Sequence, residues 1–405
     1  MASADNDARL LAEHALGAPL LLADGAAPDF SEHYEALIAR RERREPLQHI
    51  TGVMWFRGQE LVSRPGVFIV RPETEVVAGT AIEAARQMIA DGAAPLVVDL
   101  CAGSGAIAAA LACEVPEAHV VAVEVDEAAA ALARENCRRL APGRVEVVRG
   151  DATDARVLND LDGCVDVVVS NPPYVPADEM PDQPEALADP AGALYGGSPD
   201  GTAVPRLVAR RALGLLAPGG ALVMEHSPSQ SAAMRRAAES LGYCCASTHR
   251  DLAGRDRYLV AERPGVWQWP TRDPVPVVSS FAPPAHDWLP GRRGVTLAYG
   301  PGRPVYACAQ GTVSFAGRVG GRGVVSIRHT MGDRSIWSTY LPIDPRVKAG
   351  DTVEKGDEIG TVSQDSTTLH WGAKTGRTTY VNPLRLTVGP PRLLPWDGDE
   401  RQGPS

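Results

Sequence analysis

The stretch LVVDLCAGSGAIAAALACEV (96–115) decides the fold, because it passes from a strand to a helix across a turn that contains glycine. Residues 96–100 are apolar and β-branched, as is typical of a buried parallel strand. Residues 104–113 are rich in alanine and predict a helix. Gly103 and Gly105 lie between the two and let the backbone approach a ligand without a Cβ clash. In doubly wound sheets this strand-end turn is where nucleotide-like ligands bind.

The alternation of strands and helices continues to about residue 260 and predicts an α/β domain. The expected strands are 119–125, 145–150, 165–170 and 221–226 with a closing strand pair, and the expected helices are 126–139, 203–216 and 229–241. Residues 217–220 (APGG) are expected to form a turn. Strands separated by helices of this length imply a mainly parallel, doubly wound sheet. Residues 5–45 have helical spacing and predict a small helical segment in front of it.

The composition favours a cytoplasmic protein. The chain has 405 residues and a formal net charge of −10, and its acidic excess lies in the first 263 residues, which argues against nucleic acid as a partner. The 7 cysteines form no C-x-x-C pair, as expected of a reduced protein. The first residues lack a basic region followed by an apolar run, and no stretch approaches the ~18 apolar residues of a membrane span. We therefore expect no membrane partner.

The chain changes character after Glu262, which predicts several domains. Residues 1–52 are expected to form a helical substrate-recognition domain, and residues 53–263 the catalytic α/β domain. Residues 264–275 are rich in proline and predict a linker. Residues 276–389 contain short β segments with glycine between them and predict an all-β domain. The tail, 390–405, is expected to be disordered.

The residues at the strand ends indicate which cofactor binds. The 99–105 turn lacks the Lys-Ser/Thr of a P-loop, and Ala108 stands where a G-x-G-x-x-G motif has its last glycine. Glu124 follows at the end of the next strand, where a carboxylate can bind both ribose hydroxyls. Asp151 ends the third strand and can accept from an adenine amino group, or alternatively cap a helix over 152–158. A ribose and an adenine without pyrophosphate machinery indicate S-adenosylmethionine, whose ammonium group Asp99 would face.

The stretch DVVVSNPPYVP (166–176) places an amide and an aromatic ring directly after a strand. Two prolines end the ladder there because they have no N–H to donate. The Asn171 Oδ1 atom and the Pro172 carbonyl can accept both N–H bonds of an incoming –NH₂ group and so orient its lone pair toward a methyl donor. Tyr174 can stack on the planar acceptor. An adenine, a guanine or a glutamine amide would all satisfy this geometry.

The motif set resembles the class I methyltransferases, and the wider sequence resembles the peptide chain release factor N5-glutamine methyltransferases, the PrmC/HemK family. The second resemblance runs from about residue 7 to residue 262. It rests on DARLLAEHALG (7–17), REPLQHITGVMWFRG (44–58), FIVRPETE (68–75), DLCAGSGAIA (99–108), NPPY (171–174), ALYGGSPDG (193–201), LAPGGALVMEHSPSQ (216–230) and RDLAGRDRYLVAE (250–262). It implies a Rossmann-like, mainly parallel seven-stranded sheet and methylation of the Gly-Gly-Gln glutamine of class I release factors.

The resemblance also implies roles for individual residues. The catalytic residues would be Asn171, Pro172 and Tyr174, with Pro173 completing the substrate site. The cofactor site would comprise Asp99, Cys101, Gly103, Gly105, Glu124, Asp151 and Asn171. Residues 71–74 would lie over the mouth of the site. The chain departs from the family at Cys101, commonly glycine, at Glu124, usually aspartate, and at Asp189-Pro190, usually Glu-Pro.

Residues from about 276 to 388 resemble the lysostaphin/LytM-type zinc endopeptidases, through the opening strands (276–317), VKAGDTVEKGDEIGTV (347–362) and LHWG (369–372). Such a peptidase needs a His and an Asp four residues apart and a later His-x-His to hold zinc and activate water. The corresponding positions here are Arg292, Thr296, Thr368 and His370. One imidazole cannot hold catalytic zinc, and His286, Asp287 and His329 are not favoured as substitutes. We expect no metal and no peptidase activity.

Two other functions are compatible with parts of the sequence. A nucleic-acid amino-group methyltransferase, acting on N6 of adenine or N2 of guanine, would use the same NPPY geometry. A cell-wall binding module attached to a vestigial methyltransferase would use the C-terminal domain instead. The acidic front part argues against the first function, and the intact cofactor motifs argue against the second.

Overall fold

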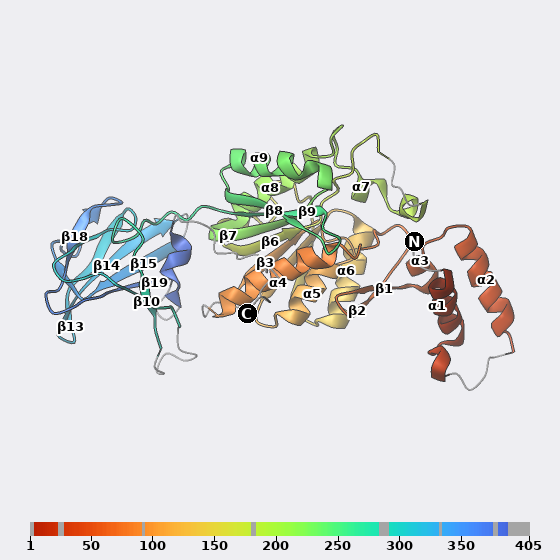
Figure 1. Cartoon of the computed structure of the whole chain (residues 1–405), viewed down its shortest axis with the longest axis horizontal. Coiled ribbons are helices and arrows are strands. Elements are labelled where there is room, and N and C mark those ends of the chain that lie inside the picture. Colours follow the sequence, from red (N-terminus) through yellow and green to blue (C-terminus); the bar gives the residue numbers. More distant parts are fainter. Residues whose placement is uncertain are drawn as a thin grey trace, which may run out of the picture.

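The computed structural model describes residues 4–22, 28–90, 94–179, 184–282, 291–331, 334–375 and 380–387. Figure 1 shows three parts in a row: helices from the N-terminal residues, a central sheet covered by helices, and a β domain from the C-terminal residues. Within the described residues, no helix has both the length and the apolar character needed to cross a membrane. All 7 cysteines are free thiols.

The N-terminal part consists of short helices around a small apolar core. They are α1 (Ala4–Leu16), η1 (Leu20–Leu22), α2 (Phe30–Glu42) and α3 (Leu47–Thr51). Leu11, Leu37 and Ile50 are buried together where the three α-helices meet. A hairpin of β1 (Val53–Phe56) and β2 (Gln59–Val62) then connects this part to the central domain.

The central domain is a seven-stranded sheet in the order β5-β4-β3-β6-β7-β9-β8. Its strands are β3 (Leu96–Leu100), β4 (His119–Glu124), β5 (Val145–Arg149), β6 (Val165–Ser170), β7 (Leu216–Glu225), β8 (Cys244–Arg250) and β9 (Asp256–Glu262). The first five in chain order are parallel, and β9 lies antiparallel between β7 and β8. This arrangement confirms the predicted mainly parallel, doubly wound fold.

Helices cover both faces of the sheet. One face carries α4 (Thr74–Ala90), α5 (Ala106–Glu114) and α6 (Glu127–Leu140), and the other carries α8 (Ala203–Leu215) and α9 (Ser231–Leu241) (Figure 1). The remaining short helices are η2 (Asn159–Leu161), η3 (Pro184–Ala188), α7 (Ala191–Leu194) and η4 (Pro228–Gln230). The inner strands β3, β4 and β6 are apolar on both sides because each side faces a helix layer, which explains their near-continuous valine runs.

Two local expectations differ from the structure. Residues 217–220 do not form a separate turn but belong to β7, whose start is irregular opposite Val165 and Val167. Residues 152–158 form turns rather than a helix, and Asp151 accepts a hydrogen bond from the Thr153 backbone instead of capping one. A side chain bonded to the backbone two residues ahead competes with helix formation.

The C-terminal part is all-β, as predicted. One sheet contains β10 (Val277–Ser279), β11 (Gly294–Leu297), β13 (Gly311–Val319), β14 (Arg322–Met331), β15 (Arg334–Leu341), β17 (Thr352–Val353), β19 (Leu369–Lys374) and β20 (Tyr380–Val381). A smaller sheet contains β12 (Pro304–Tyr306), β16 (Ile343–Pro345) and β18 (Glu358–Val362), and η5 (Pro383–Leu386) follows. The predicted tail 390–405 lies outside the described residues.

The stretch predicted as a linker, 264–275, contributes to the core of the β domain. Trp267 is fully buried there and lies 6.0 Å from Trp371, measured between ring centroids. Its backbone N–H donates to the Leu386 carbonyl. The proline content predicted a linker because proline disfavours regular helices and strands. A buried tryptophan can nevertheless anchor a segment without regular secondary structure in the core of a domain.

The β domain packs against the end of the sheet where β7 begins. A Cβ added at Gly219 would lie 2.0 Å from the Arg385 carbonyl oxygen, so only a glycine permits the approach of η5. Figure 1 shows the β domain at the opposite end of the molecule from the N-terminal helices.

Candidate functional site

A cavity of about 840 Å³ opens at the carboxyl ends of the parallel strands. Its wall includes Cys101 and Gly103 after β3, Glu124 at the end of β4, Asp151 after β5, and the Asn171–Tyr174 loop after β6. Residues far apart in the chain thus meet at one edge of the sheet, as the sequence predicted. A volume of this size accommodates a nucleoside together with an acceptor group.

The turn after β3 has an unusual backbone. Cys101 has φ 64°, in the left-handed region that favours glycine, and this explains why the resembling family commonly has glycine there. Gly103 has φ 55°, and nothing lies within 4 Å of the position that a Cβ would occupy. The cavity therefore extends up to the Gly103 backbone.

Gly105 has a different role from Gly103. It has φ 80°, precedes α5, and would place a Cβ 3.0 Å from the Ala133 Cα atom of α6. It does not belong to the cavity wall that the described residues form. The structure places it where α5 and α6 approach closely, and its predicted contact with the cofactor remains a prediction.

Glu124 is held in a fixed orientation by two backbone donors. Its Oε2 accepts from the Gly103 N–H at 2.7 Å, and its Oε1 accepts from the Asp126 N–H at 2.9 Å. The side chain is buried, yet it contributes to the cavity wall. Each carboxylate oxygen has a second lone pair, so both can accept a further hydrogen bond from a pair of adjacent hydroxyls.

Asp99 lies beneath this turn and is fully buried. Its Oδ2 accepts from the Ala108 N–H at 3.1 Å, while burial and the nearby Glu124 charge raise the pKa of the Asp99 carboxyl to about 8. Asp99 is absent from the cavity wall that the described residues form, so its contact with the ammonium group of the cofactor stays a prediction.

Asp151 is exposed at the opposite wall. Its Oδ1 accepts from the Thr153 N–H at 2.8 Å and from the Thr153 hydroxyl at 2.7 Å. These two contacts fix the carboxylate beside the cavity and leave Oδ2 available as an acceptor.

The loop after β6 contributes Asn171 and Pro172 to the cavity wall. The Ser170 hydroxyl donates to the Leu100 carbonyl at 2.7 Å and ties the ends of β6 and β3 together. Asn171 donates through Nδ2 to the Thr74 Oγ1 at 3.2 Å, which leaves its Oδ1 as the free acceptor. Tyr174 donates from its hydroxyl to Glu225 Oε1 at 2.9 Å.

Two segments brace the loop and the rim of the cavity. The Val175 N–H donates to the Leu194 carbonyl, and the Gly196 N–H donates to the Val175 carbonyl. Gln230 donates through Nε2 to the Tyr174 carbonyl at 2.7 Å. These contacts explain why ALYGGSPDG and the segment after β7 belong to the motif set.

Of the 71–74 segment, Arg71 contributes to the cavity wall. Arg71 forms an ion pair with Asp189, and the Ile69 N–H donates to the same carboxylate at 3.1 Å. Asp189 is therefore the partner that connects 68–71 to 189–190, and Arg71 and Pro190 both contribute to the cavity wall.

The sequence analysis missed several residues around the cavity. Val67, Phe68, Leu194 and Leu207 add apolar wall, and Glu225 lies behind Tyr174. Glu225 carried a signal in the sequence, because an acidic residue ends the apolar run ALVMEH on the strand next to the NPPY strand.

The degenerate positions of the β domain do not form a comparable site. Thr296 and His370 lie directly opposite each other on β11 and β19, and burial lowers the pKa of the His370 imidazole. Arg292 donates to the Ser280 carbonyl, and Thr368 accepts through its carbonyl from Ser366. His286 and Asp287 lie outside the described residues. Among the residues that are described, no group of three or more His, Cys, Asp or Glu side chains could hold a metal ion.

His329 is buried inside the β domain instead. Its Nε2 lies 2.7 Å from the Ser338 hydroxyl and its Nδ1 lies 2.8 Å from the Gln310 carbonyl oxygen. Both ring nitrogens are thus engaged within the core, where solvent does not reach.

Comparisons with known proteins assign the three parts. Residues 1–52 match the PrmC N-terminal domain, residues 59–186 the methyltransferase small domain, and residues 290–383 peptidase family M23. Among solved structures, a 16S rRNA N2 G1207 methyltransferase from T. Thermophilus is 20% identical, with a TM-score of 0.37 over 52% of this chain and 49% of that chain.

Curated relatives are more similar. The release factor glutamine methyltransferase of Bifidobacterium longum is 43% identical over 64% of this chain and 92% of its own length, and that of Streptomyces coelicolor is 48% identical over 58% and 82%. A 4-amino-L-phenylalanine/4-methylamino-L-phenylalanine methyltransferase of Streptomyces pristinaespiralis is 43% identical over 56% and 77%. With 92% of a relative's length matched at 43% identity, the chain belongs to the release factor glutamine methyltransferase family, to which it adds a region similar to peptidase family M23.

Proposed function

We propose that this protein uses S-adenosylmethionine to methylate the N5 atom of the Gly-Gly-Gln glutamine in class I release factors. The observation that carries the proposal is that Asn171 and Pro172 both line the cavity, with the Asn171 amide held by Thr74. Asn171 donates to Thr74, so its oxygen is the atom left for an incoming –NH₂ group. The cytoplasm, where release factors act, is the corresponding location.

The cavity fits the cofactor on structural grounds. The free space above Gly103 admits a ligand against the backbone, and the fixed Glu124 carboxylate can accept from both ribose hydroxyls. Asp151 can accept from the adenine amino group at the opposite wall. When bound, the cofactor supplies a methyl group on a positively charged sulfur, which is electrophilic.

The protein contributes orientation rather than a strong base. Asn171 and Pro172 would accept the two N–H bonds of the glutamine amide and turn the nitrogen lone pair toward the methyl donor. The nitrogen gains the methyl group and loses one of its two protons, so the positive charge leaves with that proton. Tyr174 packs its ring against the planar amide while Glu225 holds its hydroxyl. The apolar wall excludes water from the acceptor.

We further propose that the C-terminal domain is not a peptidase. Of its four candidate positions, only His370 is a zinc ligand by type, and the described His329 is engaged in the core. Residues 1–52 would serve as the substrate-recognition domain and residues 53–263 as the catalytic domain.

A methylation assay with several acceptors tests the function. The protein is incubated with S-adenosylmethionine labelled in the methyl group and with a release factor, its Gly-Gly-Gln variant carrying Gln→Ala, duplex DNA, or 4-amino-L-phenylalanine. We expect label on the release factor alone. Label on the Gln→Ala variant, or on DNA in place of the release factor, would refute the proposal.

The small-molecule acceptor is included because one relative is named for it. An arylamine is also a planar –NH₂ acceptor and would fit the same pair of oxygens. Transfer to 4-amino-L-phenylalanine with no transfer to the release factor would assign the chain to that activity.

A further inference from the structure

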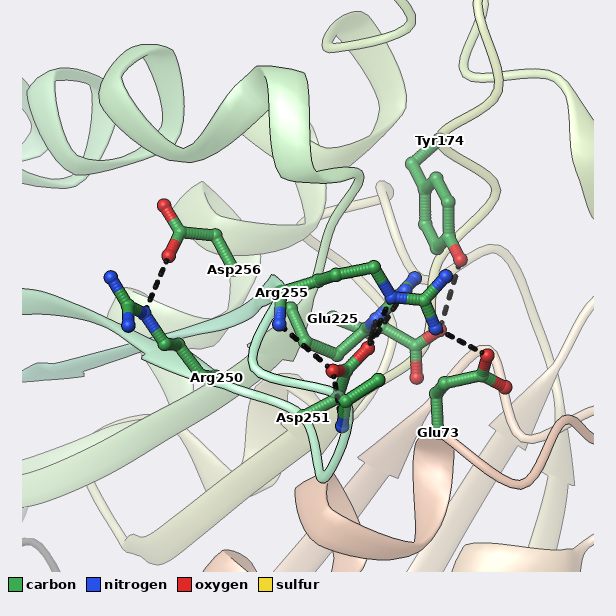
Figure 2. A network of polar contacts seen from close by, with 9 residues as sticks. Glu73, Tyr174, Glu225, Arg250, Asp251, Arg255 and Asp256 are labelled. Atoms are coloured by element: carbon green, nitrogen blue, oxygen red, sulfur yellow. Dashed lines mark hydrogen bonds and ion pairs between the residues drawn. The ribbon is translucent and has the colours of Figure 1, made fainter.

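Glu225 is a buried acidic residue that the proposed transfer step does not use directly. It is the last residue of β7 and is 1% exposed. Ser170 and Met224 are paired across β6 and β7, so Glu225 stands beside the start of the NPPY loop. Figure 2 shows its carboxyl group below the Tyr174 hydroxyl, surrounded by charged side chains from other segments.

The carboxyl group accepts a hydrogen bond from the Tyr174 hydroxyl and lies near the Thr74 hydroxyl. Tyr174 donates to Oε1 at 2.9 Å. The hydroxyls of Thr74 and Tyr174 both lower the pKa of Glu225, although burial dominates and raises it. Thr74 in turn accepts from Asn171 Nδ2 at 3.2 Å. Tyr174 is therefore linked to the Glu225 carboxyl group directly, and Asn171 is linked to it through Thr74.

A hydrogen-bond acceptor at this position determines where the Tyr174 and Thr74 hydroxyls point their protons. An ionised carboxylate has only lone pairs to offer, so the Tyr174 hydroxyl donates to it, and the nearby Thr74 hydroxyl is attracted to point its proton the same way. The Thr74 oxygen then has only lone pairs facing Asn171, which turns the Asn171 –NH₂ group inward and its Oδ1 toward the cavity. A reversed Asn171 would present N–H bonds to the N–H bonds of the acceptor.

The charged residues around Glu225 form ion pairs with one another and not with Glu225. Arg257 on β9 lowers the pKa of Glu225, but its guanidinium is ion-paired with Asp251 at 3.1 Å. Glu73 raises the pKa of Glu225 and is itself paired with Arg255 (Figure 2). The second oxygen of Glu225, Oε2, is buried without a hydrogen-bond partner among the described residues. Burying such an atom destabilises a fold, so the benefit of Glu225 must be sought at the site.

We propose that Glu225 is a positioning residue for the acceptor site, which orients Tyr174 directly and the Asn171 amide through Thr74. The proposal rests on the proposed amide-methylating function of the same cavity. The specificity for an –NH₂ acceptor then depends on Glu225 and Thr74, which lie behind the cavity wall, and not on the NPPY loop alone. We call the connection from Glu225 through Thr74 to Asn171 the relay.

Kinetics of Glu225→Gln test the proposal. The glutamine keeps the shape of the side chain but can donate to Thr74, which would permit Asn171 to reverse. We expect kcat to fall ~10–100-fold, with cofactor Kd and the thermal midpoint changing little. Glu225→Asp, which keeps the charge, should restore part of the lost rate.

A second variant avoids reliance on one substitution. Thr74→Val breaks the relay to Asn171 without altering the buried charge, and it should also lower kcat. The Glu225→Gln/Thr74→Val double variant should be no slower than the slower single variant, because both remove the same orientation. Independent, multiplying losses would overturn the relay.

Tyr258→Phe is a matched control. It also removes a buried tyrosine hydroxyl, which lies 2.9 Å from the Thr80 Oγ1, but Tyr258 is not part of the cavity wall. Its kcat should equal that of the parent protein. An equal loss of rate in Tyr258→Phe and Glu225→Gln would show that the effects are structural.

The pH profile supplies a readout that a purely structural role would not move. Glu225 must be ionised to accept from both sides, and burial places its pKa above the usual 4.5. The parent kcat should therefore fall on acidification with an apparent pKa above that value, and this acid limb should disappear in Glu225→Gln. A limb that persists would overturn the proposal. If the parent fails to methylate any release factor, the proposed function fails first, whatever the variants do.

Discussion

The central domain and the β domain each have a buried apolar core, but they differ in how the polar residues at their candidate sites are arranged. At the cavity, the polar groups of Glu124, Asn171 and Tyr174 are each held by hydrogen bonds within the protein. In the β domain, Thr296 and His370 face each other across β11 and β19 without further metal-binding side chains among the described residues. The apolar core of each domain specifies its fold, whereas a few partnered polar atoms specify its chemistry.

The largest expected effect comes from removing an acceptor of the central site. Asn171→Ala should lower kcat ~10²–10³-fold, by analogy with the loss of one oriented hydrogen-bonding group from an active site. Cofactor Kd, measured by calorimetry, should change much less because Asn171 orients the acceptor. Equal losses in kcat and in cofactor affinity would contradict this role.

Glu124→Gln should weaken cofactor binding ~10–100-fold. Both carboxylate oxygens accept from backbone N–H groups, so an amide must turn its –NH₂ group toward one of those donors. Calorimetric titration with S-adenosylmethionine measures the effect. Glu127→Gln, on the exposed surface of α6, is the control and should bind normally.

Asp99 should make the stability of the cofactor-free protein dependent on pH. Its folded pKa is raised to about 8, above the usual 3.8, so the folded state holds a proton that the unfolded state releases. Stability is therefore highest below about pH 4 for this group and declines as pH rises to about 8. In Asp99→Asn, the urea midpoint should fall less between pH 5 and pH 8 than in the parent. Parallel declines would show that another group is responsible.

Cys101→Gly should stabilise the fold by ~0.5–1 kcal/mol, because glycine adopts a positive φ without the Cβ penalty. Urea unfolding measures this gain. Cys245→Gly is the matched control, since Cys245 also has a positive φ, of 62°, but lies on β8 away from the cavity. Both variants should gain stability, and only Cys101→Gly should alter cofactor Kd.

The smallest effect is expected from metal removal. A chelator such as EDTA should leave methyl transfer and the thermal midpoint unchanged. The Arg292→His/Thr296→Asp variant sharpens the comparison, because Thr296 already faces His370 and the two changes complete a set of three ligands. This variant should bind zinc in calorimetry. Zinc binding by the parent protein with equal affinity would contradict the degenerate interpretation.

The sequence predicted the central fold well because its signals are local and repeated. Valine runs buried on both sides specify parallel strands, and the glycine turn after residue 100 specifies where they meet a ligand. The positions of Cys101, Gly103, Glu124, Asp151 and the NPPY loop around one cavity follow from the topology, since parallel strands end at the same edge.

Other features depend on contacts between distant segments, which no local pattern reveals. The inclusion of Trp267 in the β-domain core could not be read from a proline-rich stretch. Gly103 and Gly105 belong to the same short motif, yet Gly105 packs against α6 and Gly103 faces the cavity. The link from Asn171 through Thr74 toward Glu225 joins three elements that are far apart in the chain.

The close approach of η5 to Gly219 has a consequence for how the chain can be extended. Gly219 and Glu225 lie at opposite ends of β7, which places the added domain ~20 Å from the acceptor site along the strand. A large protein substrate can then reach the mouth of the cavity without meeting the added domain. The added domain therefore contacts the sheet near the amino end of β7, whereas the cavity lies at the carboxyl ends of the parallel strands.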